Sequence, residues 1–340
     1  QAAVQQLDAV SRRGLSGFVV PLFGSWALVG QGKTHEALAR LSQLASVNGV
    51  SVLHDLHAGL INDLAGRLLA AETHYRNAYQ KSDSSSLRIA QAMGSLLERT
   101  GRGAAAKEIY QGQLRDNPES LVLEAALKRV DRGEPGTRLI DNAVDGAAEA
   151  MFNVAGTLLQ ENSLQHGLAY GRLAIDMRPD FAVARLLVGQ ILEALGRQRD
   201  AIKVYEGVAA SSPLRWAARL RQATSLESVG DDTAAIRELR AMAEEQKDRY
   251  DALVSLGDLL RSKKRYAESV AAYDGAVTRI GKLDQRHWSL LYSRGISLER
   301  SKQWPRAEQD FQTALQLNPD QPYVLNYLGY SWVDQGANID

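Results

Sequence analysis

The chain has 340 residues, in which 40 Lys and Arg balance 40 Asp and Glu, and it contains no Cys. The zero net charge argues against a nucleic-acid-binding module, since such a module carries an excess of basic residues. Without Cys the chain cannot form disulfides, thiolate metal sites or a Cys nucleophile. The length allows two ordinary domains or one elongated array of repeats.

The longest apolar stretch lies near the N-terminus, over residues 17–30. Pro21, Gly24 and Ser25 interrupt it, and it is too short to cross a bilayer. We therefore predict no transmembrane segment in these 340 residues. Drawn as a helix around Trp26, the stretch is apolar on nearly every side, which predicts that both of its faces are covered. The cover would be either a preceding helix or a segment of a partner protein.

Small residues recur along the whole chain at a spacing close to 34 residues. A first series consists of Ala3, Ala37, Ala71, Ala106, Gly167, Ala201, Ala235, Ser269 and Ala307. A second series consists of Ser25, Gly59, Gly94, Ala155, Gly189, Ala223, Gly257, Gly295 and Gly329. Where the two series overlap, both take the same irregular steps of 35, 61 and 38 residues. Shared irregular steps indicate that one structural unit recurs.

Each unit predicts a pair of helices. A large residue follows most members of the first series by four positions, as Tyr75 and Tyr110 do, and glycines such as Gly66 mark a turn between the two small positions. Two antiparallel helices approach most closely where their facing side chains are small, and large residues a turn away fill the remaining space. A single hairpin cannot bury its apolar face, so the pairs must stack on one another.

This pattern resembles the tetratricopeptide repeat over nearly the whole chain. That family has a 34-residue helix–turn–helix unit with Gly or Ala in the first helix, Ala and then an aromatic residue in the second, and a closing Pro. The resemblance implies an all-α fold, namely a right-handed superhelical α-solenoid of antiparallel helix pairs. It also implies that ligands lie against the concave wall formed by the first helices.

The irregular steps predict the domain organisation. Residues 1–118 would form an N-terminal block that starts within a repeat, residues 119–147 a shortened, degenerate repeat, and residues 148–340 a C-terminal block that ends within a repeat. The run from Gly133 to Gly136, with Pro135 in it, must break the helix, so we predict two short helices within residues 119–147. A defective unit weakens the coupling between neighbours and is a candidate hinge. An equally rigid short hairpin is the alternative.

Both ends of the sequence have half of a helix pair. Ala3, Leu7 and Val10 have the spacing of a second helix, and residues 323–335 have the pattern of a first helix. We therefore expect the 340 residues to be a piece of a longer array.

Candidate catalytic motifs are weak. Residues 27–34 end in Gly32-Lys33-Thr34 and fit a relaxed phosphate-binding loop, but Gly32 falls at the turn of a repeat and no strand precedes it. His54 and His57 could share a helix face, but a zinc site needs a third donor. We predict an inter-helix turn, no bound metal, no cofactor and no catalytic residue.

The register of the repeats predicts which residues line the concave wall. In the N-terminal block these candidate partner-binding residues are Leu22, Phe23, Trp26, Leu53, Leu56, His57 and Leu60. In the C-terminal block they are Tyr292, Tyr323, Asn326, Tyr327 and Tyr330. Tyrosines combine rigid apolar area with a polar tip and are enriched at interfaces. We predict Trp332 to be a core residue.

These observations predict a non-catalytic scaffold or adaptor that binds a protein or peptide partner in its groove. Residues 302–308 and 323–336 resemble long bacterial tetratricopeptide proteins, several of them exported or lipid-anchored. Adaptors that present substrates to a periplasmic carboxyl-terminal processing protease belong to that group. The resemblance implies a cell-envelope location and a lipid anchor in a missing N-terminus, while a cytoplasmic location stays open. The alternative function is the regulatory or substrate-presenting region of an enzyme whose catalytic domain lies outside these residues.

Overall fold

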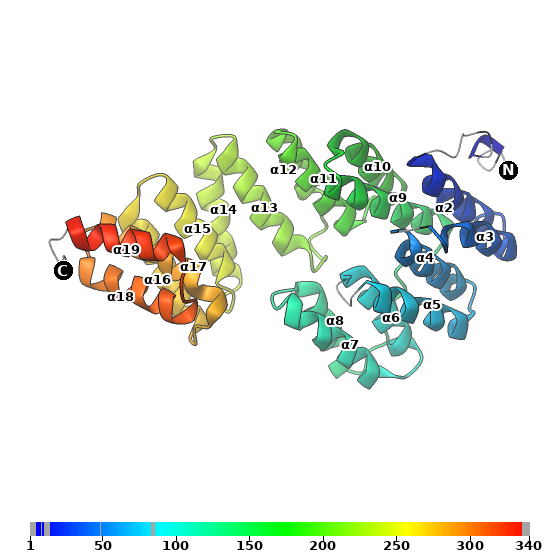
Figure 1. Ribbon diagram of the computed structural model, residues 1–340, viewed down its shortest axis with the longest axis horizontal. Helices are drawn as coiled ribbons and strands as arrows, with labels where there is room; N and C mark the ends of the chain where they lie inside the picture. Colours follow the sequence, from blue (N-terminus) through cyan, green and yellow to red (C-terminus); the bar gives the residue numbers. More distant parts are fainter. Residues whose placement is uncertain (1–4, 8, 10–13, 48, 83–85, 335–340) are drawn as a thin grey trace. The chain divides into compact units, whose positions relative to one another are not determined.

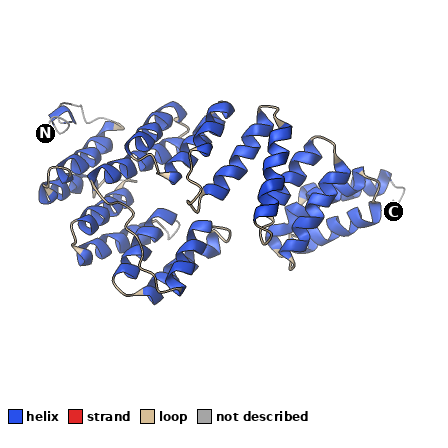
Figure 2. Ribbon diagram, turned by 180° about the vertical axis from the view of Figure 1, so that it is seen from behind, coloured by secondary structure: helices blue, strands red, loops and turns tan. Residues whose placement is uncertain are grey.

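The computed structural model describes residues 5–7, 9, 14–47, 49–82 and 86–334. In these ranges it contains helices and no β-strand (Figures 1 and 2). Consecutive helices pair and the pairs stack, so the predicted all-α solenoid of antiparallel helix pairs is confirmed. Two residues of the predicted N-terminal second helix, Ala3 and Val10, lie outside the described residues, as does Gln335. None of the described helices is both long and apolar enough to cross a bilayer.

Close contacts divide the chain into unit 1, residues 1–218, and unit 2, residues 219–340. The division falls within α13 (Arg215–Ser228). The degenerate repeat of residues 119–147 lies inside unit 1, and its role as a hinge stays a prediction.

From α2 to α12, unit 1 contains five helix pairs and one first helix, α8, that has no second helix. Its first helices are α2 (Ser16–Val29), α4 (Ser51–Leu64), α6 (Leu87–Arg99), α8 (Leu121–Asp131), α9 (Ala143–Gln160) and α11 (Ala182–Ala194). Its second helices are α3 (Thr34–Leu41), followed by the short helix η1 (Ser42–Leu44), then α5 (Leu68–Lys81), α7 (Gly103–Asp116), α10 (Leu164–Met177) and α12 (Gln198–Glu206).

Unit 2 continues the alternation of first and second helices. It contains α14 (Asp232–Glu245), α15 (Asp251–Ser262), α16 (Tyr266–Ile280), the short helix η2 (Gln285–His287), α17 (Trp288–Arg300), α18 (Trp304–Leu317) and α19 (Pro322–Asp334). Here α15, α17 and α19 are first helices. The helix α19 contacts α18 and has no second helix of its own among the described residues.

The turn within a pair depends on one residue in the left-handed region. Gly66 follows α4 with a φ of +74°, and the next N–H, that of Arg67, donates to the carbonyl of Asn62 at 2.8 Å. This bond closes the end of the helix, and glycine adopts the required φ without steric cost. In unit 2 the same position holds Gly230, Lys264 and Lys302, with φ of +84°, +60° and +64°.

Within a pair the helices meet at what we call a glycine socket, where a glycine of the first helix faces an aromatic ring of the second. A methyl group on Gly295 would lie 2.5 Å from Cε1 of Phe311, and one on Gly257 would lie 2.5 Å from Cε1 of Tyr273. Real Cβ atoms essentially never approach closer than 3.0 Å, so only glycine fits without movement. The other sockets are Gly59–Tyr75, Gly94–Tyr110 and Gly189–Tyr205. The prediction that small residues line the seams is thereby confirmed.

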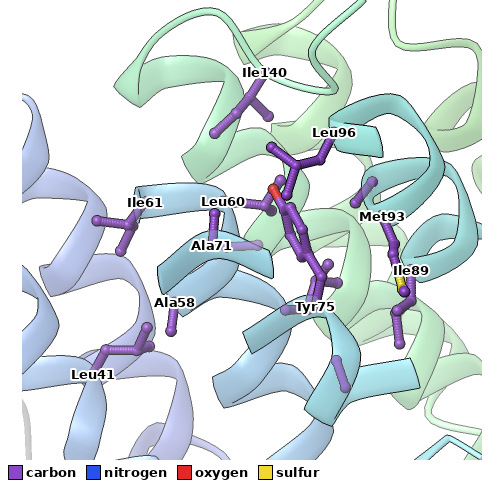
Figure 3. Close-up of a cluster of buried hydrophobic side chains, with 14 of the residues drawn as sticks. Leu41, Ala58, Leu60, Ile61, Ala71, Tyr75, Ile89, Met93, Leu96 and Ile140 are labelled. Carbon is purple, nitrogen blue, oxygen red and sulfur yellow. The ribbon is translucent and has the colours of Figure 1, made fainter. Parts of the chain in front are cut away.

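Figure 3 shows the core around one of these rings. Tyr75 of α5 points between Leu60 of α4 and Leu96 of α6, with Ala71 beside it. Ile140 approaches the same cluster from outside the helix pairs and is 2% exposed. The core of unit 1 therefore includes residues from the irregular segment that precedes α9.

Residues 132–142, which we call the irregular segment, stand in place of one of the two short helices predicted for residues 119–147. The helix α8 ends at Asp131, Gly133 has a φ of +67°, and the chain stays non-helical to Asn142. Pro135 has no N–H with which to continue a helix. The prediction of a second short helix is wrong, because residues 143–147 belong to the 18-residue helix α9.

The irregular segment crosses α4 and α6. The Ser95 hydroxyl of α6 donates to the carbonyl of Thr137 at 2.5 Å. Arg138 Nε lies 3.8 Å from Asp63 Oδ1 on α4. The side chain of Asn142 then accepts the N–H groups of residues 144 and 145, which caps α9.

The helix α9 packs against α2 and α4, far from its own place in the sequence. Gly146 of α9 lies against the indole of Trp26 with no room for a methyl group. The carboxylate of Glu149 is fully buried and receives the guanidinium of Arg88 from α6, with Nε to Oε1 at 2.9 Å. In unit 1, therefore, helices that belong to distant repeats pack directly against one another.

Candidate protein-binding surfaces

The N-terminal wall predicted from the repeat register lies in the interior of unit 1. Its residues Leu22, Trp26, Leu56, His57 and Leu60 are at most 3% exposed. Phe23 and Leu53 are half-buried against the same cluster. We expected a preceding helix or a partner segment as the cover, and the structure places the later helix α9 there. Whether these residues bind a partner stays a prediction, and in this structure the chain itself covers them.

A buried polar contact holds this wall together. The indole N–H of Trp26 donates to Nδ1 of His57 at 3.0 Å, and the rings meet edge to face. Burial lowers the pKa of His57 to about 3, so its ring is neutral at neutral pH. Its Nε2 has no hydrogen-bond partner among the described residues. Among all the residues that the structure describes, no three His, Asp or Glu side chains lie close enough together to hold a metal ion.

A cavity of about 480 Å³ opens at the edge of this wall, between α2 and α9. Its lining is mostly apolar and includes Phe23, Trp26, Met151 and Met177. Val144, on its rim, is 50% exposed. Of the seven predicted wall residues, Phe23 and Trp26 thus reach a cavity.

The tyrosine wall predicted in unit 2 is at the surface. We name the tyrosine surface by its residues Tyr292, Tyr323, Asn326, Tyr327 and Tyr330. Tyr323 is 70% and Tyr330 75% exposed, and Asn326 is also exposed. Tyr292 and Tyr327 are half-buried, and their rings meet edge to face with centroids 6.0 Å apart. The five residues therefore lie on α17 and α19. The rings of Tyr323 and Tyr330 project on either side of the exposed Asn326, and the rings of Tyr292 and Tyr327 form the floor.

The core under the tyrosine surface holds its floor in place. The ring of Phe311 lies 5.3 Å from that of Tyr327 and 6.2 Å from that of Tyr292, measured between centroids. The Tyr327 hydroxyl donates to Glu299 Oε2 at 3.1 Å. Burial raises the pKa of Tyr292 and of Tyr327, and Glu299 raises that of Tyr327 further. Both phenols therefore stay protonated and neutral in the physiological range.

Trp332 lies on another side of α19 from the projecting tyrosines. It packs half-buried against the core cluster around Phe311, as we predicted for a core residue. Its indole N–H donates to Glu308 Oε1 at 2.7 Å, which fixes the ring against α18.

A polar pocket that sequence reasoning missed lies within unit 1. It has a volume of about 320 Å³ and is lined by α6, α8 and the turns before α11 and α13. Arg88 and Arg178 approach the ring of Phe181, with Cζ 5.5 and 5.0 Å from its centroid. Arg129 donates two hydrogen bonds, of 2.7 and 2.8 Å, to the buried carboxylate of Glu98. These arginines come from separate repeats, so no local motif announced them.

The relaxed phosphate-binding motif is an ordinary turn. Gly32 has a φ of +76° between α2 and α3, and the Lys33 ammonium lies 3.3 Å from Glu36. A phosphate loop follows a strand, and here the helix α2 precedes the turn. The predicted inter-helix turn is confirmed.

Similar proteins are found by family and by structure. Models described as tetratricopeptide repeat match residues 25–86, 186–250, 220–284 and 288–321. No curated protein sequence matches the chain. The structure of YrrB, described as a TPR protein with an unusual peptide-binding site, is 18% identical, with 53% of this chain and 91% of that chain covered and a TM-score of 0.39.

Two further solved structures are similar to parts of this chain. A tetratricopeptide repeat protein from Parabacteroides merdae is 16% identical, with 83% of this chain and 99% of that chain covered and a TM-score of 0.42. PilW, described as a type IV pilus biogenesis factor, is 13% identical, with 71% and 97% covered and a TM-score of 0.46. Because the repeat matches span more than half of the sequence and the helix pairs have the glycine sockets that the repeat requires, the chain belongs to the tetratricopeptide repeat family.

Proposed function

We propose that this protein is a non-catalytic scaffold whose tyrosine surface binds a segment of a partner protein. Tetratricopeptide repeat proteins generally mediate protein–protein interactions. The observation that supports the choice of surface is the exposure of α19: four of its large apolar side chains, Tyr323, Leu325, Tyr330 and Val333, are 48–75% exposed. Exposed apolar residues gathered on one element are typical of an interaction site.

The geometry indicates how a segment would be held. Tyr323 and Tyr330 lie two helical turns apart on one side of α19, with Asn326 between them. Their rings would cover apolar side chains of the partner, and their hydroxyls would bond to its backbone. The amide of Asn326 offers both a donor and an acceptor to the same backbone. The half-buried rings of Tyr292 and Tyr327 would form the base of the site.

The test is to capture the partner and then remove the anchors. A photo-crosslinking amino acid at Asn326 should link the partner in cells, whereas the same group at Leu69, an exposed residue of unit 1, should not. The double variant Tyr323→Ala/Tyr330→Ala should then bind the captured partner at least tenfold more weakly, since truncating interface tyrosines removes about 1.4 kcal/mol or more. The control Leu69→Ala, which also truncates an exposed apolar side chain, should bind normally. Equal binding by the double variant would contradict the proposal.

A narrower hypothesis concerns the class of partner. The likeness of residues 302–308 and 323–336 to exported bacterial repeat proteins supports an adaptor that delivers substrates to a cell-envelope processing protease. Capture from a cell-envelope extract tests it: the wild-type chain should retain a carboxyl-terminal processing protease, and Tyr330→Ala should retain less. Captured material without such a protease would reject this hypothesis and leave the tyrosine surface to be tested as above.

A further inference from the structure

The polar pocket of unit 1, which we call the arginine pocket, is lined by four guanidinium groups. They belong to Arg88, Arg129, Arg138 and Arg178. Three of them have a carboxylate partner of their own, in the pairs Arg88–Glu149, Arg129–Glu98 and Arg178–Asp180. In these three pairs the charges balance, so the net charge of the site depends on the fourth guanidinium.

Arg138, from the irregular segment, shares its carboxylate with another arginine. Its Nε lies 3.8 Å from Asp63 Oδ1, which is too long for a hydrogen bond. Arg99 donates to Oδ2 of the same carboxylate at 2.6 Å. Together with the three balanced pairs, five guanidiniums therefore face four carboxylates. The pocket has one positive charge in excess, and the side chain of Arg138, which is 39% exposed, carries it.

The carboxylates lie mostly behind the guanidiniums. The side chains of Glu98 and Glu149 are 2% and 0% exposed, whereas those of their arginine partners are 26% and 16% exposed. Of the four carboxylates only Asp180 lines the pocket, and its side chain is 77% exposed to water. A ligand in the pocket would therefore meet the positive ends of the ion pairs first, and an anionic group is the one that fits.

The remaining lining of the pocket is largely apolar. It comes from α8, from the irregular segment and from the turns before α11 and α13, and it includes Val122, Ala125, Leu139, Val183 and Leu214. The volume of about 320 Å³ lies in the range of sites that hold small ligands. A ligand that matches both parts of the lining has one charged end and a short hydrocarbon body.

We propose that the arginine pocket binds a single carboxylate group attached to a short hydrocarbon body. The charge count favours carboxylate over phosphate: a carboxylate carries one negative charge, which matches the excess, whereas a phosphate monoester carries about −1.5 to −2. The planar fork of Arg138 would hold both carboxylate oxygens. The group can come from a free carboxylic acid or from the last residue of a polypeptide. The site lies within unit 1 and does not depend on the tyrosine surface.

Two probes with the same hydrocarbon group distinguish these sources. Isocaproate is the free acid, and N-acetyl-Ala-Ala-Leu with a free carboxyl terminus represents the polypeptide. In calorimetry with the whole 340-residue chain, at least one probe should bind saturably with a Kd below about 1 mM. Tripeptide binding at least tenfold tighter than that of isocaproate would assign the site to a polypeptide end, and any other ratio would assign it to a free acid.

Neutral probes and matched variants test the role of charge. The amides of both probes keep the shape without the charge and should bind at least tenfold more weakly. Arg138→Gln should lose affinity to the same extent. The control Arg132→Gln removes an exposed guanidinium that pairs with Glu134 outside the pocket, and it should bind within twofold of the wild type. The double variant Tyr323→Ala/Tyr330→Ala should also bind normally, which separates this site from the proposed function.

The proposal would be overturned by any of four results. These are no saturable binding of either acid up to about 10 mM, equal affinity for acid and amide, equal binding by Arg138→Gln, and tighter binding of phenyl phosphate than of both acids. The comparison of acid with amide uses the wild-type chain, so it does not depend on the folding of any variant. Circular dichroism would verify that Arg138→Gln folds.

Discussion

Gly295 and Gly329 occupy the same position in two first helices, yet among the residues that the structure describes only Gly295 has an aromatic ring against it. We expect Gly295→Ala to destabilise unit 2 by about 1–2 kcal/mol, because overpacking against Phe311 outweighs the gain in helix propensity. Gly329→Ala should instead stabilise the same unit by up to about 1 kcal/mol, because only the propensity changes. Urea unfolding followed by circular dichroism compares the two variants. Equal effects of the two substitutions would show that the sockets are not tightly packed.

His57 provides a second prediction at the residue scale. Its folded pKa of about 3 lies below the ordinary value of 6.5, so the unfolded state binds a proton that the folded state does not. The stability due to the neutral ring is complete above pH 6.5 and is lost as the pH falls toward 3, at about 1.4 kcal/mol per pH unit. Unfolding free energies of the wild type and of His57→Phe should therefore converge between pH 6.5 and pH 5. A constant difference over that range would show that His57 titrates alike in the folded and unfolded states.

At the scale of elements, the contact between α6 and α9 depends on one buried ion pair. Glu149 is fully buried and Arg88 is its partner. Removing one member leaves an unpaired buried charge, so Arg88→Ala should cost about 3–5 kcal/mol of stability in unit 1. The double variant Arg88→Met/Glu149→Leu should recover most of this loss, since a matched apolar pair avoids the desolvation cost. Thermal unfolding of both variants measures the difference, and an equally unstable double variant would contradict the argument.

The helix pairs could be predicted from sequence, while the closure of unit 1 could not. Gly59, Gly94 and Gly295 report contacts between adjacent helices, and these contacts recur at a fixed spacing. The contact of Gly146 with Trp26 joins residues from distant repeats, so no period contains it. The same limit explains why the sequence predicts a preceding helix or a partner segment, and not α9, as the cover of the N-terminal wall, and why it does not predict the arginine pocket.

The tyrosine surface was predictable because it depends on one helix and its nearest neighbour. Tyr323 and Tyr330 share one side of α19 by helical periodicity alone. The half-burial of Tyr327 was not predictable in the same way. It depends on the position of Phe311, which only the packing of α18 against α19 determines.

At the scale of the whole molecule, the two units differ in how their repeats are coupled. In a plain repeat array each pair contacts only its neighbours, so protection against unfolding varies along the chain. Unit 2 follows this pattern through the described residues. In unit 1 the contacts of α9 with α2 and α4 connect distant repeats. Unit 1 should therefore open as one cooperative body, and unit 2 should open progressively from α19.

Native-state hydrogen exchange resolved by mass spectrometry tests this difference. In the wild type, peptides from α2, α4, α6 and α9 should exchange with one common free energy, while protection in unit 2 should fall from α15 toward α19. In Arg88→Ala the first group should lose protection together, because removing one contact from a cooperative body lowers the opening free energy at every site in it. Peptides from α17 and α18 should keep their wild-type rates in that variant. Loss of protection confined to α6 and α9 would show that the contact between distant repeats does not make unit 1 cooperative.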